Sequence, residues 1–480
     1  MSDNEADIAN LVVTLPLASV VAAAGCGKTE QIVKAAQLGA ERRLILTHTH
    51  AGVDALRARL KAHGVPSSRF HVDTIAGWCL RYAAAFPMRS GLTVTEPKSG
   101  KDWDAVYASA ARLLQSEAVN RVVTASYFGL LVDEYQDCGG PQHKVITAIS
   151  TLLPTCVFGD PLQAIFDFNG QKSVDWPGEV FPAFPKAGTL VKPWRWTKSN
   201  NPDMATWLAA VRTTLESGGK LDFTAVPACV KWMPLPASSG PRQGKIIASC
   251  LTVMSRPGRL VLIDDPVNLN GRALIAKKLA KRGFSNIEPV DCKSAFSAAR
   301  KLDVSDGPQR LIAATGFLAA CISDVGAKEF LKAVASRKLG GKLGTARYGR
   351  LIELGVALDK TATDQACLEL IEAFSARDGT YVFRREMLSA MRSALKIRIA
   401  GEATTLADAL WYVQNRGRHG GRYIPHRSVG STLLVKGLEF EHAVVVFSPN
   451  MSARDWYVAL TRATQTLTVL SPQCAFTPAE

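Results

Sequence analysis

The sequence predicts an α/β protein that is built on parallel sheets and carries a helical region in its second half. Short apolar runs bounded by turn residues are typical of buried parallel strands, and they occur at 44–46, 129–132, 156–158, 260–263 and 443–447. Helical patterns at 52–62 and 141–153 lie between the earlier runs, as the crossover helices of a parallel sheet would. A phosphate-loop pattern supports the same fold class, because such a loop connects a strand to a helix.

The phosphate-loop pattern is carried by five consecutive residues, Gly25, Cys26, Gly27, Lys28 and Thr29. A strand pattern at 20–24 precedes them and a helical pattern at 30–38 follows. In such a loop the backbone N–H groups surround the phosphates, the lysine ammonium reaches the terminal phosphates and the hydroxyl ligates Mg²⁺. The N-terminus of the helix also favours the anion. Alone, this segment predicts only that a nucleotide binds with Mg²⁺.

Two carboxylates, Asp133 and Glu134, follow the apolar run 129–132. We expect them at the carboxyl edge of the sheet, where open α/β folds bind ligands. Asp133 would hold the metal and Glu134 would polarise the attacking water. An acid pair after a strand is usually a solvated turn, but together with a phosphate loop it indicates ATP hydrolysis.

Gln163 and Arg462 are further candidates for this chemistry. Gln163 follows the apolar run 156–158 and would sense the terminal phosphate at the same sheet edge. Arg462 would neutralise charge on the transferring phosphoryl group. Without the other segments, Arg462 would be read as an ordinary arginine on a helix surface.

Composition narrows the class of protein. The chain has 480 residues, which suggests about two to four domains, and 57 Lys and Arg against 42 Asp and Glu give a formal net charge of +15. This excess favours a polyanionic partner such as nucleic acid, although a merely soluble basic protein would carry the same charge. Ten scattered cysteines without zinc-site spacing fit a reducing, cytoplasmic compartment. The apolar run 8–25 imitates a signal peptide, but acidic residues precede it and the phosphate loop follows, and no other run is suited to span a membrane.

Helical patterns dominate from about residue 292 to residue 420, and strand signals are missing there. A Gly- and Arg-rich segment at 415–422 ends this region, and strand patterning then resumes. The helical part is therefore expected to be inserted into a second α/β domain.

The motifs, taken in order, resemble those of the superfamily 1 helicases of the UvrD, Rep and PcrA type. Matching segments are 25–29 (motif I), 46–50 (motif Ia), 73–77 (the next DNA-contacting motif), 133–137 (motif II), 159–166 (motif III), Trp194-Arg195 (motif IV), 435–440 (motif V) and 458–463 (motif VI). The tail Gln136-Asp137 of motif II is specific, because most phosphate-loop enzymes lack it.

The resemblance implies two RecA-like lobes. The first lobe would comprise 1–85 and 126–186 around a small insertion at 86–125, and the second would comprise 187–290 and 426–480 around a mainly helical insertion at 291–425. ATP would bind between the lobes, with Arg195 and Arg462 reaching it from the second lobe. The protein would be a DNA-dependent ATPase that translocates on single-stranded DNA with 3′ to 5′ polarity and unwinds tailed duplexes.

The resemblance also implies individual contacts. The nucleotide would be held by Gly25, Cys26, Gly27, Lys28, Thr29, Glu30 and Glu439, and Mg²⁺ by Thr29 and Asp133. DNA would be contacted by Thr49, His50, Thr74, Phe168 and Lys436. Phe168 would stack on a base, which contributes about 1–3 kcal/mol, unless it is a core aromatic. The basic segment 416–427 either clamps phosphates or is a solvated loop.

Some positions depart from the family pattern. No glutamine precedes the phosphate loop, and Ala76, Asn169 and Leu433-Leu434 replace polar residues that are usual in the family. A second hypothesis therefore stays open, in which the chain is a nucleotide-sensing subunit that controls a partner such as a nuclease and unwinds little. The short chain resembles the helicase subunit of Gabija-type antiphage systems in this respect. A third class, a phosphate-loop kinase or GTPase, is disfavoured by Gln136-Asp137 and Thr461-Arg462.

Overall fold

The computed structural model describes residues 4–39, 41–94, 96–97, 99–166, 172–289, 292–341, 347–419 and 424–479. The chain divides into two compact units. The first unit is Met1–Leu221 with Ser452–Gln465, and the second is Asp222–Met451 with Thr466–Ala479. Each is built on a six-stranded sheet, and the α/β fold with two RecA-like sheets that the sequence predicts is confirmed.

The first sheet has the strand order β3-β2-β4-β5-β1-β6, and all five neighbouring pairs are parallel. Its strands are β1 (Leu17–Ala22), β2 (Arg43–Thr47), β3 (Phe70–Thr74), β4 (Gly129–Val132), β5 (Thr155–Gly159) and β6 (Lys186–Leu190). Because every pair is parallel, the loops that follow the strands all leave from one edge, the carboxyl edge.

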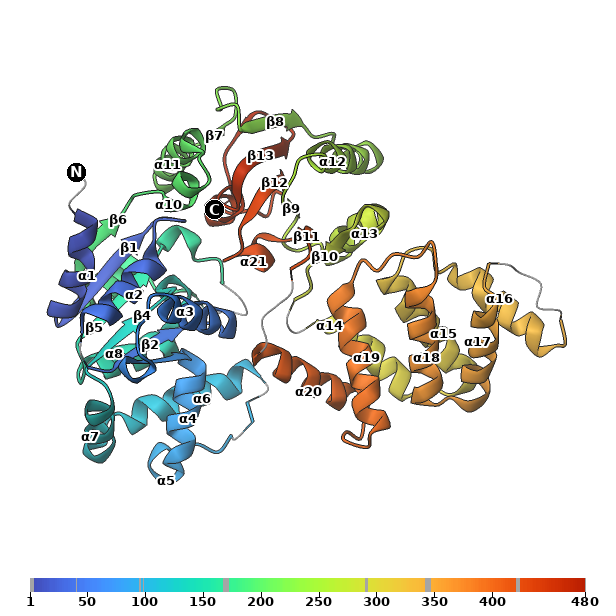
Figure 1. Cartoon of the computed structure of the whole chain (residues 1–480), viewed down its shortest axis with the longest axis horizontal. Helices are drawn as coiled ribbons and strands as arrows, with labels where there is room; N and C mark the ends of the chain where they lie inside the picture. The colour runs from blue at the N-terminus through green and yellow to red at the C-terminus, as the bar shows by residue number, and fades with distance from the viewer. Residues whose placement is uncertain are drawn as a thin grey trace. The chain divides into compact units, whose positions relative to one another are not determined.

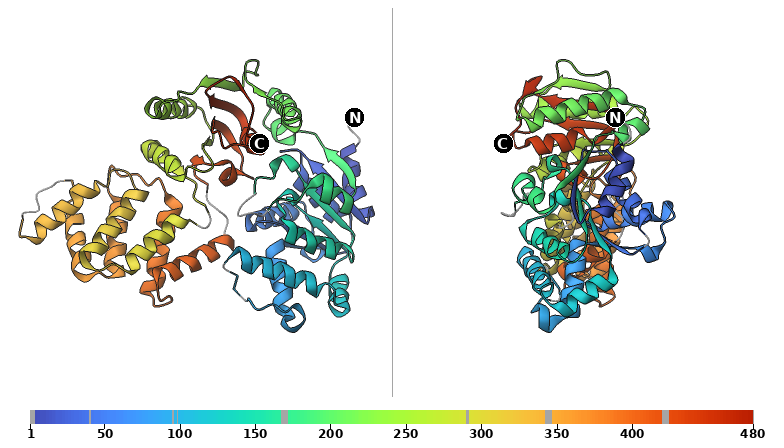
Figure 2. Two further views of the ribbon diagram at one scale, coloured as in Figure 1. Left: turned by 180° about the vertical axis from the view of Figure 1, so that it is seen from behind. Right: turned by 90° about the vertical axis from the view of Figure 1, so that its left-hand side faces the viewer.

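Both faces of this sheet are covered by helices, as Figures 1 and 2 show. Within β4, Leu130 and Val132 belong to one hydrophobic cluster and Leu131 belongs to another, because successive side chains point to opposite faces. One cluster includes residues of α1 (Asn4–Thr14), α2 (Lys28–Leu38) and α3 (His50–Ala62). The other includes residues of α4 (Ile75–Ala85), α6 (Gly100–Leu113), α7 (Glu117–Ser126) and α8 (Gly140–Ser150). A strand buried on both faces must be apolar throughout, which is why β4 is visible in the sequence.

The segment 86–125 forms α5 (Pro87–Ser90), α6 and most of α7. Val106 and Val119 of these helices are fully buried in the same cluster as Leu130. This small insertion is therefore packed into the core of the first sheet.

The first unit also contains α9 (Phe181–Ala183), α10 (Trp194–Lys198) and α11 (Pro202–Glu216). The later segment of the chain adds α22 (Ala453–Leu460), which contacts α11. Trp196 Nε1 donates to the carbonyl of Ala463 at 2.9 Å, which ties α10 to the residues after α22.

The second sheet has the order β10-β11-β9-β12-β13-β8. Its strands are β8 (Val230–Pro234), β9 (Leu260–Ile263), β10 (Phe284–Asn286), β11 (Arg427–Gly430), β12 (Phe440–Val446) and β13 (Ala463–Ser471), and a two-stranded sheet pairs β7 (Leu221–Asp222) with β14 (Ala475–Phe476). Helices α12 (Ser239–Val253), α13 (Leu269–Leu279) and the short α21 (Thr432–Val435) accompany the larger sheet. The chain leaves it after β10 and returns at β11, which pairs directly with β10.

Between β10 and β11 the described residues form helices and no strand. The helices are α14 (Lys293–Asp303), α15 (Gly307–Cys321), α16 (Ala327–Lys338), α17 (Arg350–Thr361), α18 (Asp364–Ala376), α19 (Arg385–Ile399) and α20 (Leu406–His419). They share a hydrophobic core of their own. The helical insertion that the sequence predicts in the second α/β part is confirmed.

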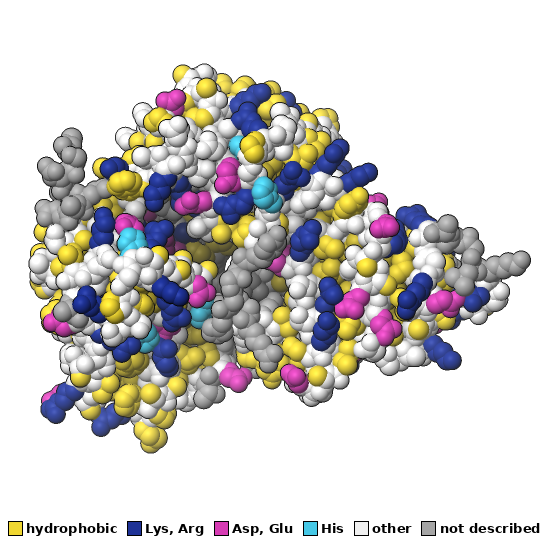
Figure 3. Space-filling view, in the orientation of Figure 1, with side chains coloured by type: hydrophobic (Ala, Val, Ile, Leu, Met, Phe, Trp, Pro, Cys, Tyr) yellow, Lys and Arg dark blue, Asp and Glu magenta, His cyan; other side chains and the backbone are white. Residues whose placement is uncertain are grey.

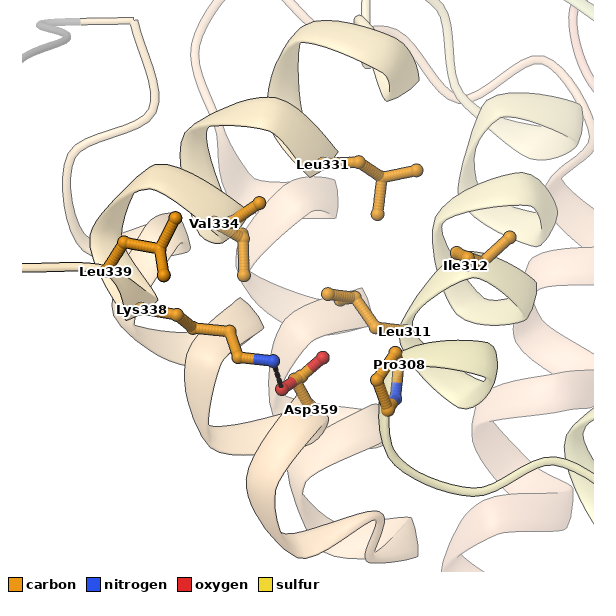
Figure 4. Close-up of a pocket in the computed structure, with 9 residues that line it drawn as sticks. Pro308, Leu311, Ile312, Leu331, Val334, Lys338, Leu339 and Asp359 are labelled. Atoms are coloured by element: carbon orange, nitrogen blue, oxygen red, sulfur yellow. Dashed lines mark ion pairs between the residues drawn. The ribbon is translucent and has the colours of Figure 1, made fainter. Parts of the chain in front are cut away.

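A cavity of about 370 Å³ lies among α15, α16 and α17 (Figure 4). Most of its lining is apolar, and an ion pair between Lys338 and Asp359 stands at one end. No group on its wall suits phosphate chemistry apart from this paired lysine, so the cavity is not a candidate for the active site. Across the described part of the chain, every helix is too short or too polar to cross a membrane.

Candidate active site

The phosphate loop needs its glycines for conformation and for space. Gly25 and Gly27 have φ of +72° and +84°, in the left-handed region that side chains with a Cβ rarely adopt. A Cβ at Gly25 would also stand 2.7 Å from the Cβ of Arg195. Gly27 caps the N-terminus of α2, and its carbonyl accepts hydrogen bonds from the backbone of Glu30 and Gln31 at 3.0 and 3.1 Å. The loop therefore ends at a helix N-terminus, a favourable position for an anion.

Lys28, the first residue of α2, reaches the acid pair that follows β4. Its Nζ lies 2.8 Å from Glu134 Oε1 and 3.7 Å from Asp133 Oδ1. Burial alone would lower the pKa of Lys28, but the charges of Glu134, Asp133 and Asp160 outweigh it and raise that pKa above its ordinary value. The ammonium thus stays charged, and the structure brings together three residues that the sequence places in one site.

Asp133 and Glu134 differ in environment although they are adjacent. Asp133 is buried, and burial, opposed by the charge of Lys28, raises the pKa of its carboxyl to about 6. Glu134 is a non-glycine residue at φ +56°, a conformation that costs about 1–3 kcal/mol. Glu134 N donates to Asp133 Oδ1 at 2.9 Å, and the Glu134 carboxylate faces Lys28.

Gln136, in the tail of motif II, forms side-chain hydrogen bonds to the acid pair and to Asp160. Its side chain is fully buried, and Nε2 donates to Glu134 Oε2 while Oε1 accepts from Asp160 N at 3.0 Å. The amide therefore links the carboxylate of Glu134 to the loop after β5. Glycine at 159 leaves room for it, because a Cβ there would stand 2.8 Å from Gln136 Oε1.

Gln163 belongs to a second hydrogen-bond network at this edge. Its Nε2 donates to Asp160 Oδ2 at 2.8 Å, and the Asp160 carboxylate is fully buried. Arg212 Nη1 of α11 lies 2.9 Å from Asp160 Oδ1 and also donates to the hydroxyl of Tyr457 at 3.0 Å. The same hydroxyl accepts from Ala24 N, directly before the phosphate loop, at 3.1 Å.

Arg212 and Tyr457 are further candidate site residues that the sequence did not predict. Tyr457 stands directly before the segment 458–463, so its place beside a candidate motif was visible. Arg212 had no local signal, because it is one polar residue in the amphipathic helix α11 and only the fold brings it to Asp160.

The two candidate arginines lie in the same compact unit as the phosphate loop. Arg195 N donates to the carbonyl of Gly25 at 3.2 Å, and Arg195 Nη1 donates to the carbonyl of Thr461 at 2.9 Å. Arg462 is 1% exposed, and its guanidinium donates to the carbonyl of Val458 at 2.8 Å and to Thr461 Oγ1 at 2.9 Å. Arg195 therefore touches the loop, whereas the guanidinium of Arg462 contacts the C-terminal end of α22, the helix that precedes it.

The candidate DNA-contacting residues of the first unit follow β2 and β3. Thr49 and Thr74 are the N-caps of α3 and α4, and their hydroxyls accept from Gly52 N and Gly77 N at 3.0 and 2.9 Å. His50 is the first residue of α3 and is half-buried. These positions share the carboxyl edge with the phosphate loop, since Thr47 and Thr74 are partners in the sheet.

The remaining candidates lie elsewhere. Lys436 follows α21 and Glu439 precedes β12, both in the second unit. Phe168 and Asn169 lie outside the described residues, and so do the side chains of Arg416, Arg418 and Arg422. Over the face seen in Figure 3, Lys and Arg side chains are interspersed with Asp and Glu.

The residues at the carboxyl edge suit Mg²⁺. Thr29 supplies a hydroxyl and Asp133 a carboxylate, and Mg²⁺ prefers such oxygen ligands. The Asp133 carboxyl, with a pKa raised to about 6, gains from a nearby cation, because a positive charge offsets the penalty of burying its ionised form. A bound Mg²⁺ would neutralise charge on the phosphates.

Residues 93–173 match the family model of the UvrD/REP helicase N-terminal domain. This segment contains Asp133, Glu134 and Gln163. For this segment, the match supports the resemblance to UvrD-like helicases of superfamily 1 that the order of the motifs indicates.

Two solved structures of Arterivirus nonstructural protein 10, a helicase, were also found. The complex with DNA is 10% identical with a TM-score of 0.36, and the other crystal structure is 10% identical with a TM-score of 0.30. The alignments cover 97% of this chain and 63% and 62% of those chains, so this chain spans less than two thirds of their length. No curated protein matches the chain.

Proposed function

We propose that this protein is a DNA-stimulated ATPase that translocates along single-stranded DNA in the 3′ to 5′ direction and unwinds tailed duplexes. The observation that carries the proposal is the position of Lys28, 2.8 Å from Glu134 and 3.7 Å from Asp133, directly after the left-handed glycines of the phosphate loop. A lysine, a metal-binding carboxylate and a second carboxylate at one sheet edge are what ATP hydrolysis requires. The family match supports the helicase class.

Each residue has a role in this proposal. The backbone from Gly25 to Glu30 and the Lys28 ammonium bind the phosphates, while Thr29 and Asp133 hold Mg²⁺. Glu134 accepts a proton from the attacking water, and its strained backbone fixes where its carboxylate points. Gln163 responds to the terminal phosphate, and Arg195 and Arg462 balance the charge of the transferring phosphoryl group. Glu439 contacts the ribose.

DNA is the proposed polymer because the chain carries a formal charge of +15 and has the DNA-contacting motifs of the family at 46–50 and 73–77. Thr49, His50, Thr74 and Phe168 contact DNA from the first α/β part, and Lys436 does so from the second. We also propose the domain limits that the resemblance implies, which fall after residues 85, 125, 186, 290 and 425.

Strand displacement tests the function. Wild type and Lys28→Ala are compared on duplexes with a 3′ tail and with a 5′ tail, and ATP hydrolysis is measured with and without single-stranded DNA. We expect wild type to displace the strand of the 3′-tailed duplex and to hydrolyse ATP faster when DNA is present. Lys28→Ala should neither displace the strand nor hydrolyse ATP in response to DNA. Hydrolysis that DNA leaves unchanged, with no displacement on either substrate, would contradict the motor and favour a nucleotide-sensing subunit of a partner such as a nuclease.

A further inference from the structure

Arg212 occupies a position at the carboxyl edge that no part of the proposed mechanism uses. It comes from α11, far along the chain from the phosphate loop and from the acid pair. Its Nη1 lies 2.9 Å from Asp160 Oδ1, 3.0 Å from Asp160 Oδ2 and 3.0 Å from the Tyr457 hydroxyl. On the outer side, its Nε pairs with the half-exposed Glu216 at 2.9 Å. One guanidinium thus contacts two groups of the candidate site at once.

The buried partner of Arg212 needs this charge. The Asp160 side chain has no exposed surface, and a buried carboxylate without a compensating cation is strongly disfavoured. Burial alone would lower the pKa of Arg212, but Asp160, Tyr457 and Glu216 raise it, so the guanidinium stays charged. Arg212, in direct contact with both carboxylate oxygens, therefore helps to fix where the Asp160 carboxylate lies.

Asp160 is connected by hydrogen bonds to Gln163 and, through Gln136, to the acid pair. Its Oδ2 accepts from Gln163 Nε2 at 2.8 Å, and its backbone N–H donates to Gln136 Oε1 at 3.0 Å. Gln136 in turn donates to the carboxylate of Glu134. A shift of Asp160 would therefore move both the residue proposed to sense the terminal phosphate and the residue proposed to activate water.

The other partner of Arg212, Tyr457, also contacts the backbone directly before the phosphate loop. The Tyr457 hydroxyl accepts from Arg212 Nη1 and from Ala24 N, and the guanidinium lies 5.2 Å from the centre of the tyrosine ring. Tyr457 is 2% exposed, so water has little access to these hydrogen bonds. The contact holds the backbone just before Gly25.

We propose that Arg212 is a positioning residue that orients Asp160 and Gln163 toward the terminal phosphate and ties the phosphate loop to them through Tyr457. The inference rests on the proposed ATPase and names a residue that sets its response to the terminal phosphate. Lysine does not reproduce this arrangement, because its ammonium stands on a flexible chain and lacks the rigid planar group that places Nη1 between the Asp160 carboxylate and the Tyr457 hydroxyl.

The test uses the full chain with Arg212→Gln, Arg212→Lys and Tyr457→Phe. The matched controls are Glu216→Gln, which removes the outer partner on the same helix, and Arg121→Gln, which removes an arginine whose side chain is 78% exposed. Fluorescent nucleotide competition gives the affinities for ADP and for a non-hydrolysable ATP analogue. Steady-state hydrolysis gives kcat and KM, and thermal unfolding reports the fold.

We expect both Arg212 variants to lower kcat by about tenfold or more, since a charge-assisted hydrogen bond at the site is lost, while KM changes by less than about threefold. The preference for the ATP analogue over ADP should fall in parallel. Tyr457→Phe should move both quantities in the same direction by a smaller factor, and it keeps the test open if Arg212→Gln fails to fold. The two controls should match wild type.

Two outcomes would overturn the inference. In one, the variants melt earlier than wild type but keep its kcat per folded molecule and its nucleotide preference, which is the behaviour of a purely structural ion pair. In the other, wild type hydrolyses no ATP, so that the proposed function fails, and the nucleotide preference is still unchanged by Arg212→Lys. A changed preference in that second case would support the role of Arg212 without the motor.

Discussion

Each of the two sheets ends a central strand in a pair of acids, and the two pairs have different surroundings. Asp133-Glu134 follows β4, and Asp264-Asp265 follows β9. In both pairs the first carboxylate is buried and accepts a hydrogen bond from the backbone N–H of the second residue at 2.9 Å. In both, burial raises the pKa of that first aspartate. The position in the sheet and the surroundings of the first acid are therefore alike in the two pairs.

The second residue of each pair makes the difference. The Asp265 carboxylate accepts three hydrogen bonds from within the protein. The donors are Val267 N at 2.7 Å, Asn268 N at 3.1 Å and Ser448 Oγ at 2.9 Å. Glu134 instead stands in a strained left-handed turn, and its carboxylate faces Lys28 and Gln136. The comparison teaches that the second acid of such a pair can either face side chains of the candidate site, as Glu134 does, or accept hydrogen bonds from the turn that follows it, as Asp265 does.

The largest expected effect is on the rate of ATP hydrolysis, which should depend on one acid pair and not on the other. Glu134→Gln should lower kcat for ATP hydrolysis by about 100- to 10,000-fold, because the proton acceptor is lost, while nucleotide binding is kept. Asp265→Asn is the matched change in the other pair and should leave kcat per folded molecule as in wild type. Steady-state hydrolysis with equilibrium nucleotide binding measures both. Equal losses in the two variants would remove the distinction between the pairs.

A smaller effect separates the pairs by stability. Asp265→Ala removes the acceptor for two backbone amides and one hydroxyl, and we expect it to lower the free energy of unfolding by about 1–3 kcal/mol. Asp133→Asn should cost less at pH 7, because it removes a buried charge and keeps the shape of the side chain. Urea unfolding of the nucleotide-free protein measures this. A greater loss for Asp133→Asn would show that its charge stabilises the fold.

The smallest effect concerns the pH dependence of stability. Because the native pKa of Asp133 is raised to about 6, the native state binds more protons than the unfolded state between about pH 4 and pH 6. The contribution of Asp133 to stability is therefore present at low pH and is lost as the pH rises through this range. Subtracting the unfolding free energy of Asp133→Asn from that of wild type, without Mg²⁺, should leave a difference that falls with pH.

Asp265 should show the opposite sign. Burial acts to raise its pKa, but the hydrogen bonds from Val267, Ser448 and Asn268 lower it overall. Its contribution is therefore present above the ordinary pKa of an aspartate and is lost in acid. The same subtraction for Asp265→Asn should rise with pH below about pH 4. Slopes of the same sign for the two aspartates would contradict this assignment.

Much of the first unit follows from sequence because its signals are local. Apolar runs such as 129–132 are strands buried on both faces, and Gly25 and Gly27 are required by their own backbone angles. Weaker strands escaped prediction: β6 has exposed positions and β10 has three residues, so neither has a distinct apolar run. The helical insertion was predictable, because a strand-free stretch with helical periodicity is also a local signal.

The sequence by itself determined that a phosphate loop and an acid pair are present, that they are followed by Gln136, and that helicase motifs occur in order. Only the tertiary structure decided which side chains occupy those carboxylates. Arg212 lies 52 positions from Asp160, Tyr457 lies 433 positions from Ala24, and Arg462 contacts the end of the preceding helix, α22. Such contacts depend on how helices pack over a sheet edge, and packing between distant segments leaves no pattern in the residues on either side.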